Sequence, residues 1–262
     1  MTDSHWNAEV YDRIGVPMRG WARAVIDDLG LRGHETVLDA GCGSGSVTFD
    51  LLERLPNGKV YAIDFSSEMI EQMQRKIAAT GERRVIVMRA DLTDFVLPEA
   101  VDVVFSNAVF HWIPDDDALF GALLRATKPG GRMRVQCGGG NIFAKLRPAW
   151  TAAWSRSPFS KHLGGYRDGK KFRSPDAAVA ALERAGWTGV RAWAFDAPVA
   201  FERDDDAALY LRTIILRDHV AQLPEELHEP YVRAVIEEYL GRFGRPFTAD
   251  YTRLNMSATA PA

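Results

Sequence analysis

The residues best suited to chemistry lie in a glycine-rich loop that follows an apolar run and precedes an amphipathic one. The loop reads DAGCGSG over Asp39 to Gly45, with glycine at positions 41, 43 and 45. Glycine lets the backbone approach a ligand closely because it has no Cβ atom. Asp64 ends the next apolar run, nineteen residues beyond Gly45, where a carboxylate can accept hydrogen bonds from both hydroxyls of a ribose. This pattern predicts a nucleotide-binding loop.

The glycine spacing separates two classes of nucleotide cofactor. Dinucleotide-binding loops read G-x-G-x-x-G and leave a helix N-terminus free for a pyrophosphate. Here the spacing is G-x-G-x-G, Asp39 stands two residues before the first glycine, and Ser46 follows the third. The spacing therefore disfavours an NAD-dependent oxidoreductase.

Length and composition argue against several other classes of function. The chain has 262 residues, 47% of them hydrophobic, and a formal charge of −3 at pH 7, so no overall positive field favours nucleic acid or anionic lipid. No apolar run approaches the roughly 20 residues that cross a bilayer, and the acidic N-terminal segment does not resemble a signal peptide. Two cysteines and no Cys/His cluster predict neither a disulfide framework nor a metal site. We expect a cytoplasmic monomer or homodimer that acts on a small molecule, without a nucleic-acid or membrane partner.

Short apolar runs alternate with amphipathic windows between Glu35 and Cys137. The expected strands are 35–40, 59–64, 84–90, 101–107 and 132–137, and the expected helices are 47–55, 67–80 and 115–127. Runs that are apolar throughout are typical of strands covered on both faces. The alternation predicts a parallel, doubly wound α/β sheet. Ser67 is the expected N-cap of its helix, and Pro129 to Gly131 are expected to end the third helix and turn into the fifth strand.

Outside this core the pattern changes. An amphipathic helix is expected over 20–29, before the sheet. The elements expected after the core are a helix over 141–154, a basic loop over 157–173, a helix from Ser174-Pro175 to Ala185, a strand over 188–195, helices over 204–219 and 224–243, and a strand over 251–259. The predicted organisation is a single domain, 1–262, with a cofactor-binding core at 35–137 and a helical cap formed by 141–185 and 204–243.

The Asp-x-Gly-x-Gly-x-Gly loop resembles the first motif of the class I S-adenosylmethionine-dependent methyltransferases. Further motifs of that family follow in order: Ala62 to Ser66, Ala90 to Leu92, Ser106 to Trp112, and Lys128 to Gly131. The resemblance implies a Rossmann-like sheet of seven strands with an N-terminal helix, and S-adenosyl-L-methionine as cofactor. The cofactor-binding residues that it implies are Asp39, Gly41, Cys42, Gly43, Asp64, Phe65, Met69, Asp91, Leu92, Asn107 and Ala108.

The two cysteines are expected to be free thiols without a catalytic role. In the strand order of the family, Cys42 follows strand one and Cys137 ends strand five, with strand four between them. Two strand spacings are roughly 10 Å, which exceeds the ~7 Å limit between Cα atoms in a disulfide.

A narrower resemblance concerns the acceptor. Trp6 to Tyr11 and Asn107 to Ile113 resemble segments of the trans-aconitate methyltransferases. Similar segments occur in the juvenile hormone acid methyltransferases, and both groups methylate the carboxylate of a small acid. The resemblance implies a small carboxylic acid as substrate and a methyl ester as product. Met18 stands where the hormone enzymes have a substrate-binding Gln, which argues against the terpenoid acid itself.

A carboxylate is already ionised at neutral pH, so its methylation requires alignment and exclusion of water rather than a general base. The expected catalytic residues are His111, Trp112 and Tyr11, with Trp6 and Trp21 as further candidates for the wall of the acceptor pocket. Trp21 is also interpretable as a core residue, and Trp150, Trp154, Trp187 and Trp193 are expected to be packing residues. The basic loop, which includes Lys161, His162, Arg167, Lys170, Lys171 and Arg173, is interpretable as a carboxylate clamp or as solvated surface.

Two alternative functions stay open at this point. His111 is a candidate general base, which N-, C- or hydroxyl O-methylation of a natural-product intermediate would need. A cofactor-binding regulatory or scaffold subunit without turnover is the non-enzymatic alternative, and the intact loop, Asp64 and the aromatic residues argue against it.

Overall fold

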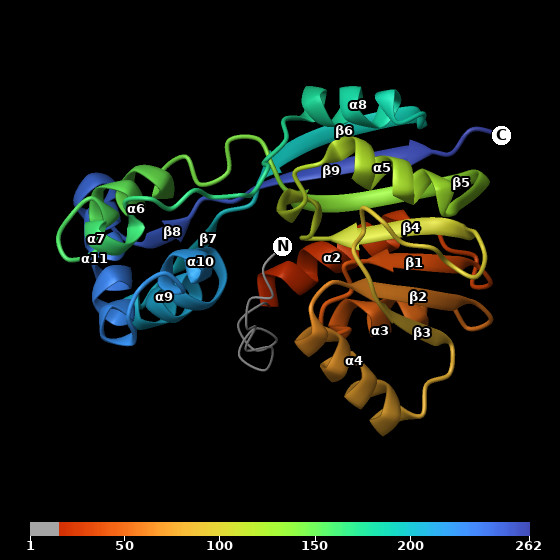
Figure 1. Ribbon diagram of the computed structural model, residues 1–262, viewed down its shortest axis with the longest axis horizontal. Coiled ribbons are helices and arrows are strands. Elements are labelled where there is room, and N and C mark those ends of the chain that lie inside the picture. Colours follow the sequence, from red (N-terminus) through yellow and green to blue (C-terminus); the bar gives the residue numbers. More distant parts are fainter. Residues whose placement is uncertain (1–15) are drawn as a thin grey trace. The chain divides into compact units, whose positions relative to one another are not determined.

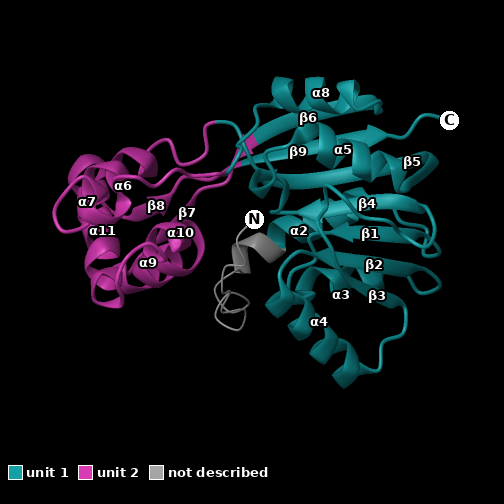
Figure 2. Ribbon diagram, in the orientation of Figure 1, with its two compact units in different colours: residues 1–140, 170–194, 253–262 teal, residues 141–169, 195–252 magenta. Residues whose placement is uncertain are grey.

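The computed structural model describes residues 16–262, and for residues 16–19 only the helical backbone is described. The chain divides into two compact units (Figure 2). Unit 1 comprises the chain up to Gly140 together with residues 170–194 and 253–262, and unit 2 comprises residues 141–169 and 195–252. The glycine loop, Asp64 and His111 therefore all belong to unit 1.

A seven-stranded sheet forms the centre of unit 1 (Figure 1). Its strands are β1 (Thr36–Ala40), β2 (Lys59–Asp64), β3 (Val85–Arg89), β4 (Val101–Asn107), β5 (Thr127–Gly138), β6 (Thr188–Asp196) and β9 (Thr252–Thr259). The strand order is β3-β2-β1-β4-β5-β9-β6. The pairs from β3 to β5 are parallel, whereas β9 runs antiparallel to β5. This topology confirms the predicted doubly wound, Rossmann-like sheet.

Helices cover both faces of this sheet. They are α2 (Val16–Asp28), α3 (Ser46–Glu53), α4 (Ser67–Thr80), α5 (Asp116–Arg125) and α8 (Pro175–Arg184), with the short 3-10 turn η1 (Phe110–Trp112) after β4. Leu38 and Ala40 of β1 contribute to a core shared with α5 and α8, whereas Val37 contributes to a second core shared with α2, α3 and α4. Neighbouring residues of a strand point to opposite faces, so one apolar strand supplies both cores.

Two local predictions in unit 1 were wrong by a few residues. The N-cap of α4 is Ser66, whose hydroxyl accepts a hydrogen bond from the Met69 amide, and Ser67 is the first helical residue. The helix α5 ends at Arg125, and β5 begins at Thr127, so that Pro129 to Gly131 lie inside the strand. The pairing between β4 and β5 shifts register between Val101 and Val103, and this irregularity accommodates the Pro-Gly-Gly sequence.

Unit 2 is mainly helical. Its elements are α6 (Leu146–Trp154), α7 (Ser160–Leu163), β7 (Val199–Phe201), α9 (Asp204–Tyr210), the π-helical turn η2 (Leu211–Ile215), α10 (Arg217–Val220), η3 (Glu225–Leu227), α11 (His228–Phe243) and β8 (Phe247–Ala249). The His219 ring lies at its centre, with ring centroids of Trp150, Trp154 and Tyr166 5.0–5.5 Å away. Its Nδ1 atom shares a 2.9 Å hydrogen bond with the Tyr231 hydroxyl.

The expectations for unit 2 were correct in element type and less accurate in element bounds. The helix expected from 141 begins at Leu146, and the loop expected over 157–173 contains α7. The helix expected over 204–219 is interrupted by η2, where the hydrogen-bonding pattern changes to i→i+5. The short antiparallel pair β7–β8 was not predicted, because three-residue strands have too few residues to show a periodic pattern.

The α8 segment was predicted to be part of the helical cap, whereas the structure groups it with the sheet. It belongs to unit 1, where Ala178, Ala181 and Leu182 are buried in the core shared with α5. Ser174 caps it as expected by accepting a hydrogen bond from the Ala177 amide. A role of unit 2 as a cap stays a prediction.

The tryptophans expected to pack fall into two groups. Trp150, Trp154 and Trp187 pack as expected, and the Trp187 indole donates a 3.0 Å hydrogen bond to the Phe120 carbonyl. Trp193 is 38% exposed and stacks with the Arg134 guanidinium, 4.3 Å from its ring centre. It lies on β6, at the edge of the sheet, so it packs against a neighbouring side chain while remaining partly exposed.

Candidate active site

The glycine loop follows β1 at the carboxyl edge of the sheet, where the strand order reverses between β1 and β4. Ligands of open α/β sheets bind in the crevice at this switch point. The amides of Gly41 and Cys42 donate to the Ile63 carbonyl at 2.8 and 2.9 Å. On the other side, the buried Ser106 hydroxyl of β4 donates to the Ala40 carbonyl at 2.6 Å. The start of the loop is thus held by both neighbouring strands.

The three loop glycines have positive φ angles and different surroundings. Their φ values are 89° at Gly41, 54° at Gly43 and 86° at Gly45. A Cβ atom at Gly41 would overlap Val109, and one at Gly45 would overlap Met73. At Gly43 the nearest atom to such a Cβ is the Met69 sulfur, 4.0 Å away. Gly41 and Gly45 therefore allow close packing of the loop, whereas Gly43 borders open space that a ligand can fill.

Asp39 lies beneath the loop rather than on its surface. Its carboxylate is 2% exposed and accepts a 2.7 Å hydrogen bond from the Thr48 hydroxyl. Burial raises the pKa of Asp39 to about 7, and the hydrogen bond from Thr48 only partly opposes this shift. Its contact with a cofactor stays a prediction, and in the structure it joins the end of β1 to α3.

Asp64, by contrast, is oriented toward the loop by backbone amides. Oδ2 accepts a hydrogen bond from the Gly43 amide and Oδ1 accepts one from the Ser66 amide, both at 2.9 Å. Burial raises the pKa of this carboxyl group, and the amide hydrogen bonds oppose the shift. Each oxygen keeps a second lone pair. The two oxygens match the two donors of a ribose diol beside the open space at Gly43.

The residues expected around an adenine are on neighbouring segments. Met69 and Leu92 are buried, and Phe65 is partly buried after β2. Asp91 accepts hydrogen bonds from the amide and the hydroxyl of Thr93 at 2.9 and 2.7 Å, both at Oδ1. These bonds fix the orientation of the carboxylate. Among the described residues they use only Oδ1, so Oδ2 can accept a hydrogen bond from the amino group of a ligand.

Both cysteines are free, as predicted, and both are buried. Burial raises the pKa of the Cys42 thiol, and it raises that of the Cys137 thiol to about 11. Both thiols are therefore protonated at neutral pH and are poor nucleophiles.

The end of β4 contains a buried polar cluster that sequence reasoning found only in part. Arg253, at the start of β9, is 2% exposed and donates to the Asn107 and Gln136 side-chain carbonyls at 3.3 and 3.2 Å. Its guanidinium also lies 4.7 Å from the ring centre of Trp21. Ala108 follows Asn107 with a φ of 63°, and its amide donates to the Gln136 carbonyl at 2.7 Å. Arg253 and Gln136 were not predicted, although an arginine in an apolar strand was a visible signal.

His111 and Trp112 form the turn that follows this cluster. The His111 ring stacks on Phe172 at 5.5 Å with an interplanar angle of 18°, and its centre is also 5.5 Å from that of Trp112. Burial, with the positive charges of Arg253, Lys170 and Arg173, lowers the pKa of His111 well below its usual value. The imidazole is thus neutral at pH 7. Its buried Nδ1 atom forms no hydrogen bond with any of the described residues.

The basic side chains of the loop predicted over 157–173 lie in different environments. Lys170 lies 4.3 Å from the ring centre of Trp112, whereas Lys171 and Arg173 form ion pairs with Asp116. Arg173 is buried, so the interpretation as solvated surface fails there. Lys161, His162 and Arg167 are exposed and belong to unit 2.

Some predicted residues lie outside the described part of the chain. These are Trp6 and Tyr11, and the side chain of Met18. Within residues 16–262, no group of three or more His, Cys, Asp or Glu side chains is arranged to hold a metal ion.

Comparison with known proteins identifies the fold of the chain and the character of residues 37–131. A family model described as a methyltransferase domain matches residues 37–131, the segment from β1 to the start of β5. Residues 37–131 are a methyltransferase domain. This match confirms the predicted resemblance to class I S-adenosylmethionine-dependent methyltransferases.

The methyltransferase domain has both curated relatives and solved structural neighbours. Trans-aconitate 2-methyltransferase of Azoarcus sp. (strain BH72) is 34% identical over 131 residues, 50% of each chain. The chain thus spans about half the length of the curated relatives it matches first. The YcgJ protein of Bacillus subtilis has a TM-score of 0.65 at 13% identity, covering 93% of this chain and 99% of that one. Phosphoethanolamine N-methyltransferase 2 of Haemonchus contortus, solved with S-adenosyl-L-methionine, has a TM-score of 0.61 at 17% identity, covering 93% and 53%.

Proposed function

We propose that this protein is a methyltransferase that uses S-adenosyl-L-methionine to methylate the carboxylate of a small organic acid. The methyltransferase domain and the neighbour solved with S-adenosyl-L-methionine support the donor. The trans-aconitate 2-methyltransferase relative supports an acid as acceptor. The predicted cytoplasmic location and the monomeric or homodimeric state stay predictions. Within residues 16–262, no helix combines the length and apolar character needed to cross a membrane.

The loop geometry fits the donor. The space beside Gly43 accepts atoms that a side chain there would displace, and the Asp64 carboxylate beside it matches a ribose diol. Asp64 and Gly43 would hold the ribose, and Met69, Leu92 and Asp91 would surround the adenine. When bound, S-adenosyl-L-methionine supplies an electrophilic methyl group on a sulfonium.

The observation that most favours an acid is the cationic environment of His111. Arg253, Lys170 and Arg173 come from two different segments, and each lowers the pKa of His111. Burial, the largest cause of the lowered pKa, disfavours any charged group, but the positive charges that add to the shift favour a negative carboxylate over a positive imidazolium. The chain as a whole has a formal charge of −3, so the positive potential is local. This arrangement supports recognition of an anionic acceptor at the end of β4.

The acceptor side needs no proton transfer. Small carboxylic acids have pKa values near 4 and are ionised at pH 7. The His111 ring stacks on Phe172 and lies tilted against Trp112, and these rings would exclude water, which removes the solvation that weakens an anionic nucleophile. Arg253 and Lys170 supply positive charge beside these rings. The chain therefore contributes alignment, desolvation and electrostatics.

The buried Nδ1 of His111 favours a second candidate function. A neutral imidazole whose Nδ1 has no hydrogen-bond partner among residues 16–262 is in the protonation state that a general base requires. Hydroxyl, amine or carbon acceptors would use such a base. The lowered pKa of His111 makes it a weak base, which favours the carboxylate reaction.

The acceptor is tested with pairs of small carboxylic acids and their neutral amides, measured by release of S-adenosyl-L-homocysteine. We expect turnover of acids and not of amides. His111→Ala should retain carboxylate methylation within about tenfold, whereas a base-dependent reaction should fall by about 10²-fold. Turnover of neutral acceptors alone, with this larger loss, would establish the second candidate instead.

The donor is tested by calorimetry with S-adenosyl-L-methionine. Asp64→Asn replaces an acceptor oxygen with an amide group that clashes with a backbone N–H. We expect it to weaken binding by about tenfold or more, since hydrogen bonds to a charged group contribute about 1.5–3 kcal/mol. Asp94→Asn, an exposed carboxylate near Asp91, is the matched control and should bind as the natural protein does. Absence of binding by the natural protein would contradict the proposed function.

A further inference from the structure

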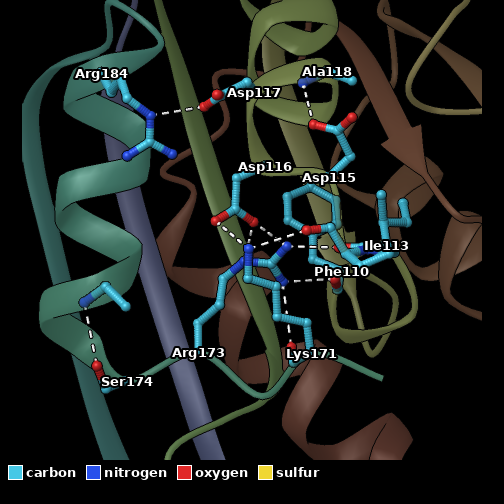
Figure 3. Close-up of polar contacts among 12 residues, drawn as sticks. Phe110, Ile113, Asp115, Asp116, Asp117, Ala118, Lys171, Arg173, Ser174 and Arg184 are labelled. Atoms are coloured by element: carbon cyan, nitrogen blue, oxygen red, sulfur yellow. Dashed lines mark hydrogen bonds and ion pairs between the residues drawn. The ribbon is translucent and has the colours of Figure 1, made fainter. Parts of the chain in front are cut away.

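The buried Arg173 binds both ends of the turn that contains His111 and Trp112, through the Phe110 and Ile113 carbonyls (Figure 3). Arg173 Nη1 donates to the Phe110 carbonyl at 2.8 Å, and Nη2 donates to the Ile113 carbonyl at 2.6 Å. Its Nε donates to Asp116 Oδ1 at 2.6 Å. The side chain is 1% exposed. A single guanidinium thus spans the turn from its first residue to the residue after its last.

The neighbouring lysine binds the rest of the same turn. The Lys171 amide donates to the His111 carbonyl at 2.8 Å. Its Nζ donates to the Pro114 carbonyl at 3.0 Å and to Asp116 Oδ2 at 2.7 Å. Burial raises the pKa of Asp116, but hydrogen bonds from Lys171 and Arg173 lower it more, so Asp116 is a carboxylate at neutral pH. The residues Asp116, Lys171 and Arg173 are called the turn clasp below.

The turn clasp holds the turn of His111 and Trp112 through backbone carbonyls and not through the side chains of these two residues. Phe172 stands between Lys171 and Arg173 in sequence and stacks on the His111 ring. The backbone of His111 and the face of its ring are therefore both held by segment 171–173. This segment lies just after residue 169, where the chain returns to unit 1.

We propose that Arg173, held by Asp116, is a positioning residue that sets the placement of His111 and Trp112 at the acceptor side of the site. This inference rests on the proposed methyltransferase function. The fork of a guanidinium reaches two carbonyls and a carboxylate in fixed directions, whereas a lysine ammonium is a single point. Charge alone therefore does not replace the arginine.

The test compares Arg173→Lys with Arg184→Lys. Arg184 pairs with Asp117 and thus joins α8 to α5 next to the turn clasp, but this pair is 55% and 70% exposed (Figure 3). Both substitutions keep the charge, and only the first removes a buried fork. The two variants are therefore matched in chemistry and in neighbouring position.

The first readout is amide hydrogen exchange in the turn. The amides of Trp112, Ile113 and Lys171 donate to the carbonyls of Val109, Phe110 and His111, so they report directly whether the turn is held. We expect Arg173→Lys to speed their exchange by about tenfold or more, and Arg184→Lys to leave it within about twofold. Unchanged exchange in Arg173→Lys would overturn the proposal.

The second readout separates acceptor from donor. We expect Arg173→Lys to lower kcat/KM for the acceptor by about tenfold or more, because it displaces Trp112 and His111 together, whereas His111→Ala removes one ring and leaves the turn in place. Its affinity for S-adenosyl-L-methionine should stay within about twofold of the natural protein, since Gly43 and Asp64 do not contact the turn clasp. An equal loss of donor binding would mean a general structural role and would overturn the proposal.

A second variant tests the same contact in case Arg173→Lys does not fold. Asp116→Asn keeps the shape of the side chain and an acceptor oxygen but leaves Arg173 without its buried counter-charge, and Asp117→Asn is its exposed control. We expect faster exchange of the same three amides in Asp116→Asn only. If the natural protein bound no donor, the proposed function would fail, while the exchange data would still decide whether Arg173 holds the turn.

Discussion

Asp39 and Asp64 flank the same loop, yet their surroundings give the two carboxylates different tasks. Asp39 faces one hydroxyl, and burial raises its pKa to about 7. Asp64 accepts hydrogen bonds from two backbone amides at the loop, and these bonds oppose the effect of burial on its pKa. The sequence motifs contain both residues, but only their hydrogen-bond partners show that Asp39 supports the loop from beneath and that Asp64 borders the open space at Gly43.

Asp39 makes stability depend on pH in a defined direction. Its folded pKa of about 7 lies above the usual 3.8, so the folded state binds more protons than the unfolded state between these values. The free energy of unfolding contributed by Asp39 therefore falls as pH rises through this window. Asp39→Asn should remove the effect, since asparagine still accepts from Thr48.

The measurement is denaturant unfolding of the ligand-free protein at about pH 4 and about pH 8. Relative to the natural protein, Asp39→Asn should gain up to about 4 kcal/mol between these pH values. The exposed Asp94→Asn variant controls for general changes in charge. An equal stability difference at both pH values would contradict the assigned protonation of Asp39.

At the scale of elements, the glycine loop and the end of β4 show what a local motif specifies. The alternating glycines predicted a close backbone approach, and the structure assigns that approach to Met73 and Val109 at two positions and to open space at the third. The strand ends were predictable because buried parallel strands are apolar throughout. The bounds around Pro129 and Ser66 were not, because register and capping depend on neighbours that the local pattern does not contain.

Gly45→Ala tests the packing requirement against backbone strain alone. Gly45 and Gly81 both have positive φ values, 86° and 67°. A Cβ at Gly45 would overlap Met73, whereas none of the described atoms lies within 4 Å of one at Gly81.

We expect Gly81→Ala to cost about 1–2 kcal/mol from backbone strain. Gly45→Ala should cost a further 1–3 kcal/mol, roughly, from overpacking. Urea unfolding of both variants measures the difference. Equal losses would show that Met73 moves aside without cost.

At the scale of the whole molecule, charge is distributed so that recognition of the proposed acid acceptor would be local. The formal charge is −3, yet three cationic side chains act on His111. Arg253 is buried among Asn107, Gln136 and Trp21. Buried charges are screened by salt far less than exposed ones.

The Michaelis constant for an acid acceptor should therefore depend weakly on salt. Between about 0.05 and about 0.5 M NaCl we expect a change of less than about threefold. Initial rates at constant, saturating S-adenosyl-L-methionine provide the measurement. A rise of tenfold or more, roughly, would indicate long-range steering by exposed charges instead.

The sequence by itself determined the sheet, the glycine loop and the methyltransferase motifs, because each depends on short segments whose pattern is visible locally. Only the tertiary structure placed Arg253 beside Asn107 and Arg173 beneath the turn of His111. The partners of Arg253 are 117 and 146 residues away in sequence. Their meeting depends on the antiparallel register of β9 against β5. A shift of one residue would turn Arg253 to the opposite face of the sheet.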